Sequence, residues 1–125
     1  MFDRLSRYAP QALAALRIVT GLLFLLHGTQ KLFGFPGSEF QPPLMSLFGA
    51  AGIIELIAGV MIIAGFFTRP AALIASGSMA VAYWMVHAPG NLFPTNNGGD
   101  ASILFCFVFL YLVFAGPGAW SVNKR

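Results

Sequence analysis

Apolar residues gather in four long stretches along the chain, with polar residues between them. The stretches run from about 11 to 33, 46 to 67, 71 to 88 and 101 to 115. A helix that crosses a membrane needs about 20 mostly apolar residues, and the stretches come close to that length. The pattern predicts an all-α fold in which one domain, residues 1–125, is an integral membrane four-helix bundle.

The segments between the stretches carry residues that favour turns. "FGFPGSEFQPP" contains three prolines, and "PGNLFPTNNGGD" is rich in Pro, Asn and Gly. "TRP" is a minimal turn in which Pro70 suits the start of a helix. Asp100 is expected to cap the fourth helix, and "GPG" to end it. These connections predict helices that run alternately up and down.

Positively charged residues collect at one set of helix ends, which carries Arg4, Arg7, Arg69, Lys124 and Arg125. The opposite ends carry only Lys31. The positive-inside rule therefore predicts that both termini lie in the cytoplasm and that the two longer loops face outward.

Composition points to lipid as the solvent. Hydrophobic residues make up 58% of the 125 residues and charged residues 9%, whereas a soluble domain carries about 25% charged residues. The net charge of +3 is small and in a membrane protein sets orientation, so no nucleic-acid partner is predicted. The single cysteine, Cys106, excludes an internal disulfide and CxxC redox or zinc chemistry within one chain. The first stretch is too long for a signal peptide and is expected to be a retained span.

Two predicted helices each carry a polar or small-residue face. The first face comprises Arg17, Thr20, Gly21, Phe24, His27, Gly28 and Lys31. The second comprises Phe48, Gly52, Glu55, Gly59, Ile62 and Phe66. A charge exposed to lipid is costly, so both faces should point into the bundle. Arg17 and Glu55 are the opposite charges at depth and are expected to pair, with His27 as the second neighbour of Glu55.

A polar pocket is expected in the outer half of the bundle. Its predicted members are His27, Gln30, Lys31, Tyr83 and His87, with Asn91 at the edge. Asn97 and Asp100 would close the pocket from the loop before the fourth helix, unless Asp100 is only a cap. The glycines beside them precede no basic residue, so no nucleotide site is predicted.

Each of these residues also has a structural interpretation. An Arg17–Glu55 pair could simply fix helix register. Gln30 and Lys31 could sit among lipid headgroups. His27 and His87 could be hydrogen-bonded within the bundle, or, as the weaker alternative, ligate a metal or haem.

Four motifs, "RIVTGLLFLLHGTQKLFGFPG", "ELIAGVMIIAGFFTRPAA", "NLFPTNNGGDASILF" and "GPGAWSV", resemble the DoxX family of small bacterial membrane proteins. The resemblance spans nearly the whole chain. It implies a four-helix protein of the bacterial plasma (inner) membrane, similar to the small membrane subunit of thiosulfate:quinone oxidoreductase. Other members are implicated in membrane-associated oxidoreductase complexes that handle thiol or oxidative stress.

The family pattern carries over to a defined set of positions: Arg17, His27, Gly28, Gln30, Lys31, Glu55, Gly59, Gly65, Thr68, Arg69, Asn97, Gly98, Gly99 and Gly116. One position departs from it, because the family usually has glutamate where Asp100 stands. The shorter carboxylate reaches less far toward any ligand.

The leading hypothesis is a membrane subunit of an oxidoreductase complex that binds a quinone or another small redox ligand in the outer pocket. Glu55 and His27 are the candidate catalytic residues, with Glu55 transferring a proton and His27, Lys31 or Tyr83 bonding a quinone carbonyl. Electrons would come from a soluble or membrane-bound redox partner. A proton or small-solute transporter and a purely structural protein are the alternatives, and a homo-oligomer is compatible with each.

Overall fold

The computed structural model describes residues 2–35 and 47–125, and all of its regular elements are helical. The main helices are α1 (Ala9–Phe33), α2 (Leu47–Ala64), α3 (Thr68–Ala82) and α5 (Asp100–Ala115). Shorter turns complete the chain: η1 (Phe2–Tyr8), the π-helical turn η2 (Tyr83–His87), η3 (Ala88–Gly90) and α4 (Pro94–Asn97). The four predicted stretches therefore all form helices. The proline-rich first loop lies outside the described residues.

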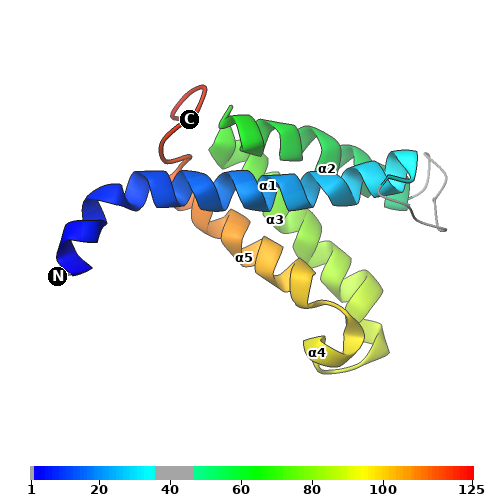
Figure 1. The fold of residues 1–125 in the computed structure, drawn as a ribbon. Helices are drawn as coiled ribbons and strands as arrows, with labels where there is room; N and C mark the ends of the chain where they lie inside the picture. Colours follow the sequence, from blue (N-terminus) through cyan, green and yellow to red (C-terminus); the bar gives the residue numbers. More distant parts are fainter. Residues whose placement is uncertain (1, 36–46) are drawn as a thin grey trace.

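The main helices form two antiparallel hairpins that meet at an angle (Figure 1). α1 packs chiefly on α2, and α3 packs chiefly on α5. The hairpins lie close together at the end that holds the C-terminal segment 116–125, called here the clasped end. They diverge toward the opposite end, called here the open end, where α4 lies (Figure 1).

Glycines set the close approach of α1 and α2. A Cβ added at Gly28 would lie 2.8 Å from the backbone nitrogen of Leu56, and one at Gly59 would lie 3.2 Å from Cα of Leu25. Gly21 and Gly52 face the partner helix in the same way. Small residues at a helix interface are the usual means of association in lipid, because they allow backbone contact. The expectation that the two small-residue faces point inward is confirmed for these positions, whereas Phe66 is exposed.

The core joins the two hairpins through aromatic rings. Phe24 of α1 is fully buried and meets Phe105 and Phe109 of α5 edge-to-face, with centroids 5.7 and 4.8 Å apart. Beneath the rings, the buried small residues Ala72 and Ala75 of α3 let α5 pack closely. Each of these aromatic contacts contributes about 0.5–1.5 kcal/mol beyond the burial of its area.

The C-terminal segment 116–125 holds the clasped end together by backbone hydrogen bonds. Its Ala119 N–H donates to the carbonyl of Pro10 at 3.0 Å, at the start of α1. Its Val122 N–H donates to Ala64 at 3.1 Å, at the end of α2. Gly65 makes room for this approach, since a Cβ there would lie 2.7 Å from Cα of Ser121. The segment therefore bonds to both helices of the first hairpin.

Arg69 joins the two helices of the second hairpin, α3 and α5, at the same end. Its Nη1 donates to the carbonyls of Val113 and Phe114 at 2.9 and 2.7 Å, in the last turn of α5. A cation at this position donates to carbonyls that α5 leaves without partners, and it interacts favourably with the negative end of the α5 dipole.

Two predicted helix starts are wrong in detail. α3 begins at Thr68, after a turn in which Gly65 and Phe67 have positive φ, so the turn predicted at "TRP" is wrong, whereas Pro70 lies in the first helical turn as predicted. The N-cap of α5 is Gly99, and Asp100 lies in the first helical turn. Its carboxylate there interacts favourably with the positive end of the helix dipole instead of capping a backbone N–H.

Two helical stretches are long and apolar enough to cross a membrane, 2–33 and 68–90. The described parts of the other two, 49–64 and 100–115, are apolar but shorter. Large apolar side chains cover the outward faces, among them Val19, Leu22 and Leu23 of α1. Such a surface needs no polar coat in lipid.

Candidate functional site

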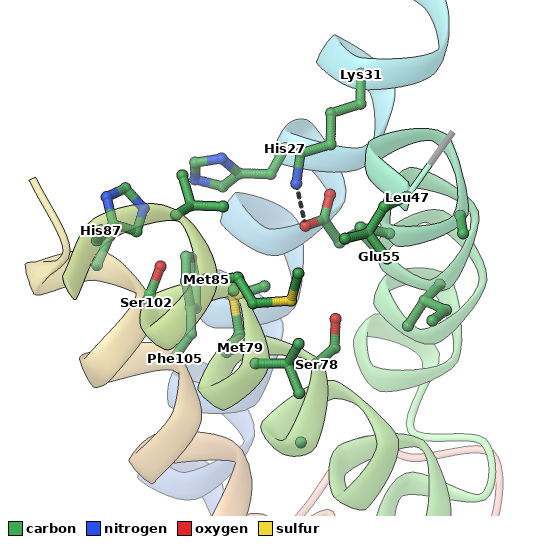
Figure 2. A pocket seen from close by; sticks show the side chains of 18 of the residues that line it. His27, Lys31, Leu47, Glu55, Ser78, Met79, Met85, His87, Ser102 and Phe105 are labelled. Carbon is green, nitrogen blue, oxygen red and sulfur yellow. Dashed lines mark hydrogen bonds and ion pairs between the residues drawn. The ribbon is translucent and has the colours of Figure 1, made fainter. Parts of the chain in front are cut away.

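A cleft of about 550 Å³ lies between the diverging hairpins (Figure 2). α2 contributes positions one helical turn apart, including Leu47, Ala51 and Glu55, and α3 faces them with a stripe that includes Gly77 and Ser78. α1, η2 and α5 complete the walls. The lining is mostly apolar, and its polar groups gather toward the open end. An apolar cavity with a few convergent polar groups is typical of a binding site for a small molecule.

Lys31 and Glu55 form an ion pair on one wall of the cleft. Nζ of Lys31 donates to Oε1 of Glu55 at 2.5 Å, and the two residues come from α1 and α2 (Figure 2). Glu55 is fully buried, while the Lys31 side chain is about a quarter exposed. The pair rests on the glycine contacts, because Gly28 packs against Cβ of Glu55 and Gly52 against Cβ of Lys31.

The second carboxylate oxygen of Glu55 has no hydrogen-bond partner among the described residues, although it is buried. A buried acceptor left without a donor costs about 1–3 kcal/mol, and more when it is charged. Because Glu55 lines the cleft, a bound molecule can supply that donor. This oxygen is the strongest chemical feature of the site.

His27 lies on the cleft wall beside this pair. Its ring meets Phe105 edge-to-face with centroids 5.7 Å apart, and much of its surface is open to the cleft. His87 reaches the same cleft from η2 (Figure 2). Its Nδ1 is 3.1 Å from the carbonyl oxygen of Asn97. The two histidines therefore line the pocket in which the sequence predicts them.

The expected Arg17–Glu55 pair is wrong. Arg17 is buried at the clasped end, where its Nη1 donates to the carbonyls of Pro117 and Ala119 and its Nη2 donates to Trp120. Glu55 packs at the level of Gly28, eleven residues further along α1 and so about 16 Å away along the axis. That separation exceeds the reach of one arginine side chain. Arg17 does not line the cleft.

Other predicted members of the pocket build its neighbouring loop. The Asn97 side chain donates to the Tyr83 hydroxyl and the Asn91 carbonyl, both at 3.0 Å, and accepts from the Gly99 N–H at 2.8 Å. None of these side chains lines the cleft. Gln30 is half-buried and Asp100 exposed, and both also lie outside its lining. Asn97 thus orders the loop whose carbonyl holds His87.

Several residues of the cleft carry no clear signal in the sequence. Ser78 and Ser102 place hydroxyl-bearing side chains on it from α3 and α5, and Met79 and Met85 supply adaptable thioethers (Figure 2). Serines in a membrane helix face other helices or cavities more often than lipid, which is the one available hint. The sequence likewise gives no sign that Gly77 lines the cleft, because only the fold shows that the space beside it is open.

Metal ligation lacks a full set of donors. In residues 2–35 and 47–125 no group of three or more His, Cys, Asp and Glu side chains comes together. His27 and His87 would need ligands from outside that part of the chain.

The hairpins, the apolar outer surface and the mostly apolar cleft with its few polar groups define a class: a small helical membrane protein with a ligand-sized cavity between its helices. Comparison with known proteins gives the family. The DoxX family model matches residues 12–88, and the chain belongs to that family.

Relatives extend the match over nearly the whole chain. An uncharacterized protein of Haemophilus influenzae is 40% identical, with 98% of this chain and 96% of the relative covered. Inner membrane protein YphA of Escherichia coli is 29% identical, with 93% of this chain and 91% of the relative covered. An uncharacterized membrane protein of Mycobacterium tuberculosis is 25% identical, covering 93% and 82%. No solved structure gives a match. Family, relatives and apolar helices place the chain in the bacterial inner membrane.

Proposed function

We propose that this DoxX protein is the quinone-binding membrane subunit of an oxidoreductase complex, and that its cleft holds the reduced form, a quinol, against Glu55. The free carboxylate oxygen of Glu55 carries the proposal. An ionised carboxylate only accepts hydrogen bonds, so it requires a ligand with a donor. A quinol hydroxyl is such a donor, whereas a quinone has none.

The dimensions and chemistry of the cleft support this ligand. A volume of about 550 Å³ lies within the range of about 300–1,000 Å³ for small-molecule sites. The apolar walls suit an aromatic ring, and Phe105 and His27 offer ring faces and edges. Ser78 and Ser102 also line the cleft and can bond a second ring oxygen.

Glu55 and Lys31 have distinct tasks in this proposal. Glu55 accepts the hydrogen bond of one hydroxyl and is the base nearest that proton. Lys31 holds Glu55 in place through Oε1, which leaves Oε2 for the ligand. A redox partner protein in the membrane or at its surface would supply two electrons, and a quinone would take up these electrons and two protons to become the quinol that Glu55 holds.

The proposal includes the arrangement in the membrane. All four main helices cross the bilayer, and the clasped end faces the cytoplasm. Arg69, Lys124 and Arg125 lie at that end and Lys31 at the other, which is the asymmetry that the positive-inside rule requires.

Binding measurements on the purified protein in nanodiscs test the proposal. The probes are decylubiquinol and its oxidised form, decylubiquinone. We expect the wild type to bind the quinol at least tenfold more tightly, since a hydrogen bond to a charged group contributes about 1.5–3 kcal/mol. Glu55→Gln should remove most of that preference.

Asp100→Asn is the matched control, because it neutralises an exposed carboxylate that does not line the cleft. It should keep the wild-type preference. Equal affinity of the wild type for both forms, or a preference that survives Glu55→Gln, would overturn the proposal.

A further inference from the structure

The wall of the cleft on α3 extends well past the polar groups. Its residues recur at helical spacing, Leu73, Ile74, Gly77, Val81 and Met85, and this set is called here the α3 groove. From Leu73 to Met85 it is about 18 Å long, at 1.5 Å per residue. Every member is exposed, so the groove is an open apolar surface along one side of the cleft.

Gly77 leaves the middle of this groove without a side chain. A Cβ at that position would meet nothing within 4 Å, unlike the tightly packed glycines of α1 and α2. The absence of a side chain there keeps open the space between α2 and α3. The other members are apolar, and the polar residue that α3 adds to the cleft is Ser78, beside Gly77, so the groove offers few hydrogen bonds along its length.

We propose that the α3 groove is the subsite for a hydrocarbon chain, and that the ligand of Glu55 is a long-chain, lipid-borne quinol that enters sideways from the bilayer between α2 and α3. This inference rests on the proposed function, since it takes the Glu55 site as the position of the head group. The groove and that site are parts of one continuous cleft. An apolar, exposed groove that ends at a buried acceptor matches a molecule with a polar head and an apolar chain.

The hydrocarbon chain of the quinol adds little binding free energy by the hydrophobic effect, because it leaves lipid that is as apolar as the groove. Its contribution is steric. An amino-acid side chain that fills the groove must displace the hydrocarbon chain of the quinol and, with it, the attached ring. A chainless quinol has nothing in the groove to be displaced. The effect of filling the groove therefore separates the two ligands.

Ile74→Trp fills the groove and has a closely matched control. Ile57 of α2 is also 57% exposed, but it does not line the cleft, so Ile57→Trp adds the same bulk to the lipid-facing surface. Affinities are measured in nanodiscs for decylubiquinol and for the same quinol without its chain. We expect Ile74→Trp to weaken decylubiquinol at least tenfold and the chainless quinol less than twofold. Ile57→Trp should change neither.

Gly77→Leu provides an independent variant, since the Cβ of the added side chain lies in open space. It should again weaken the chain-bearing quinol more than the chainless one. If wild-type protein binds both quinols and both groove variants weaken them equally or not at all, the inference fails and the proposed function stands. If wild-type protein binds neither quinol in preference to its quinone, the proposed function itself fails.

Discussion

Arg17 and Pro117 are 100 positions apart in the chain and are joined by a hydrogen bond between the guanidinium and the proline carbonyl. Two further carbonyls, of Ala119 and Trp120, accept from the same guanidinium at 3.0 and 2.8 Å. Nη1 and Nη2 of this fully buried arginine thus donate to the backbone of one short segment. The most polar residue of the first helix organises the clasped end and takes no part in the cleft.

Arg17→Lys tests this role. A lysine keeps the charge but lacks the planar fork that reaches three carbonyls at once. We expect the free energy of unfolding to fall by about 3 kcal/mol, because carbonyls are left without a charged donor. SDS titration in mixed micelles measures it. Arg7→Lys, at an exposed arginine, should change it by less than about 0.5 kcal/mol. Equal effects of the two variants would refute the assignment.

Substitution of Gly116, in the turn after α5, should also lower the free energy of unfolding. Its φ of 80° and ψ of −169° lie in a region that is almost restricted to glycine, and a Cβ would lie 2.9 Å from Nη2 of Arg69. Gly116→Ala is expected to cost about 1–3 kcal/mol in the same unfolding assay. Gly90→Ala, where a Cβ meets nothing within 4 Å, is the control and should be nearly neutral.

Close packing of α1 on α2 gives a third expectation. Gly28→Ala would place a methyl group 2.8 Å from a backbone nitrogen, so the helices must separate, at about 1–3 kcal/mol. Gly77→Ala adds the same methyl group to open space and should gain about 0.5–1 kcal/mol from helix propensity. Unfolding energies that shift in the same direction for both variants would contradict the packing described.

The Lys31–Glu55 pair predicts a non-additive result. Lys31→Met leaves a buried carboxylate without its cation and should cost about 3–5 kcal/mol. Adding Glu55→Met should restore most of that loss, because no unpaired charge remains. A double variant as unstable as the sum of the two single variants would show that the pair does not couple them.

Orientation can be measured with single cysteines in a Cys106→Ala background. Asn96→Cys lies in α4 at the open end, and Lys124→Cys lies in the C-terminal segment. An impermeant maleimide added to intact spheroplasts should label only Asn96→Cys, while permeabilised cells label both. The reverse pattern would place the clasped end outside and invert the proposed arrangement.

Sequence reasoning located the helices well because lipid imposes a simple rule on each of them. Every lipid-facing stretch must be apolar over many residues, and polar turns interrupt it. The predicted 11–33 and 101–115 correspond to Ala9–Phe33 and Asp100–Ala115. The third stretch continues from α3 through a π-helical turn to His87, a change of hydrogen-bonding pattern that apolar periodicity does not encode.

The partners of the charges were harder to predict. Arg17 bonds to backbone carbonyls, which every residue carries, so no side chain in the sequence marks them. Lys31 and Glu55 were each singled out, but their pairing depends on the offset between α1 and α2 that Gly28 and Gly52 fix. Once that offset is known, Lys31 lies nearer to Glu55 than Arg17 does.

The cleft itself depends on how far the hairpins diverge, which no local pattern reveals. His27, His87 and Lys31 were placed in it correctly because they share a depth near the open end. Tyr83 and Asn97 have the same polarity and depth but bond to each other. Small rotations of a helix separate residues that face a cavity from residues that build its rim.

The fastening of the clasped end also sets an order of assembly during synthesis. The carbonyls that accept from Arg17 are made 100 residues after it, when the sequences of all four main helices have already been synthesised. Until then the first helix holds an arginine whose acceptors do not yet exist. Insertion of that helix must therefore rely on water or lipid phosphates around the guanidinium, and the protein reaches its final shape only when its tail folds back across the helices.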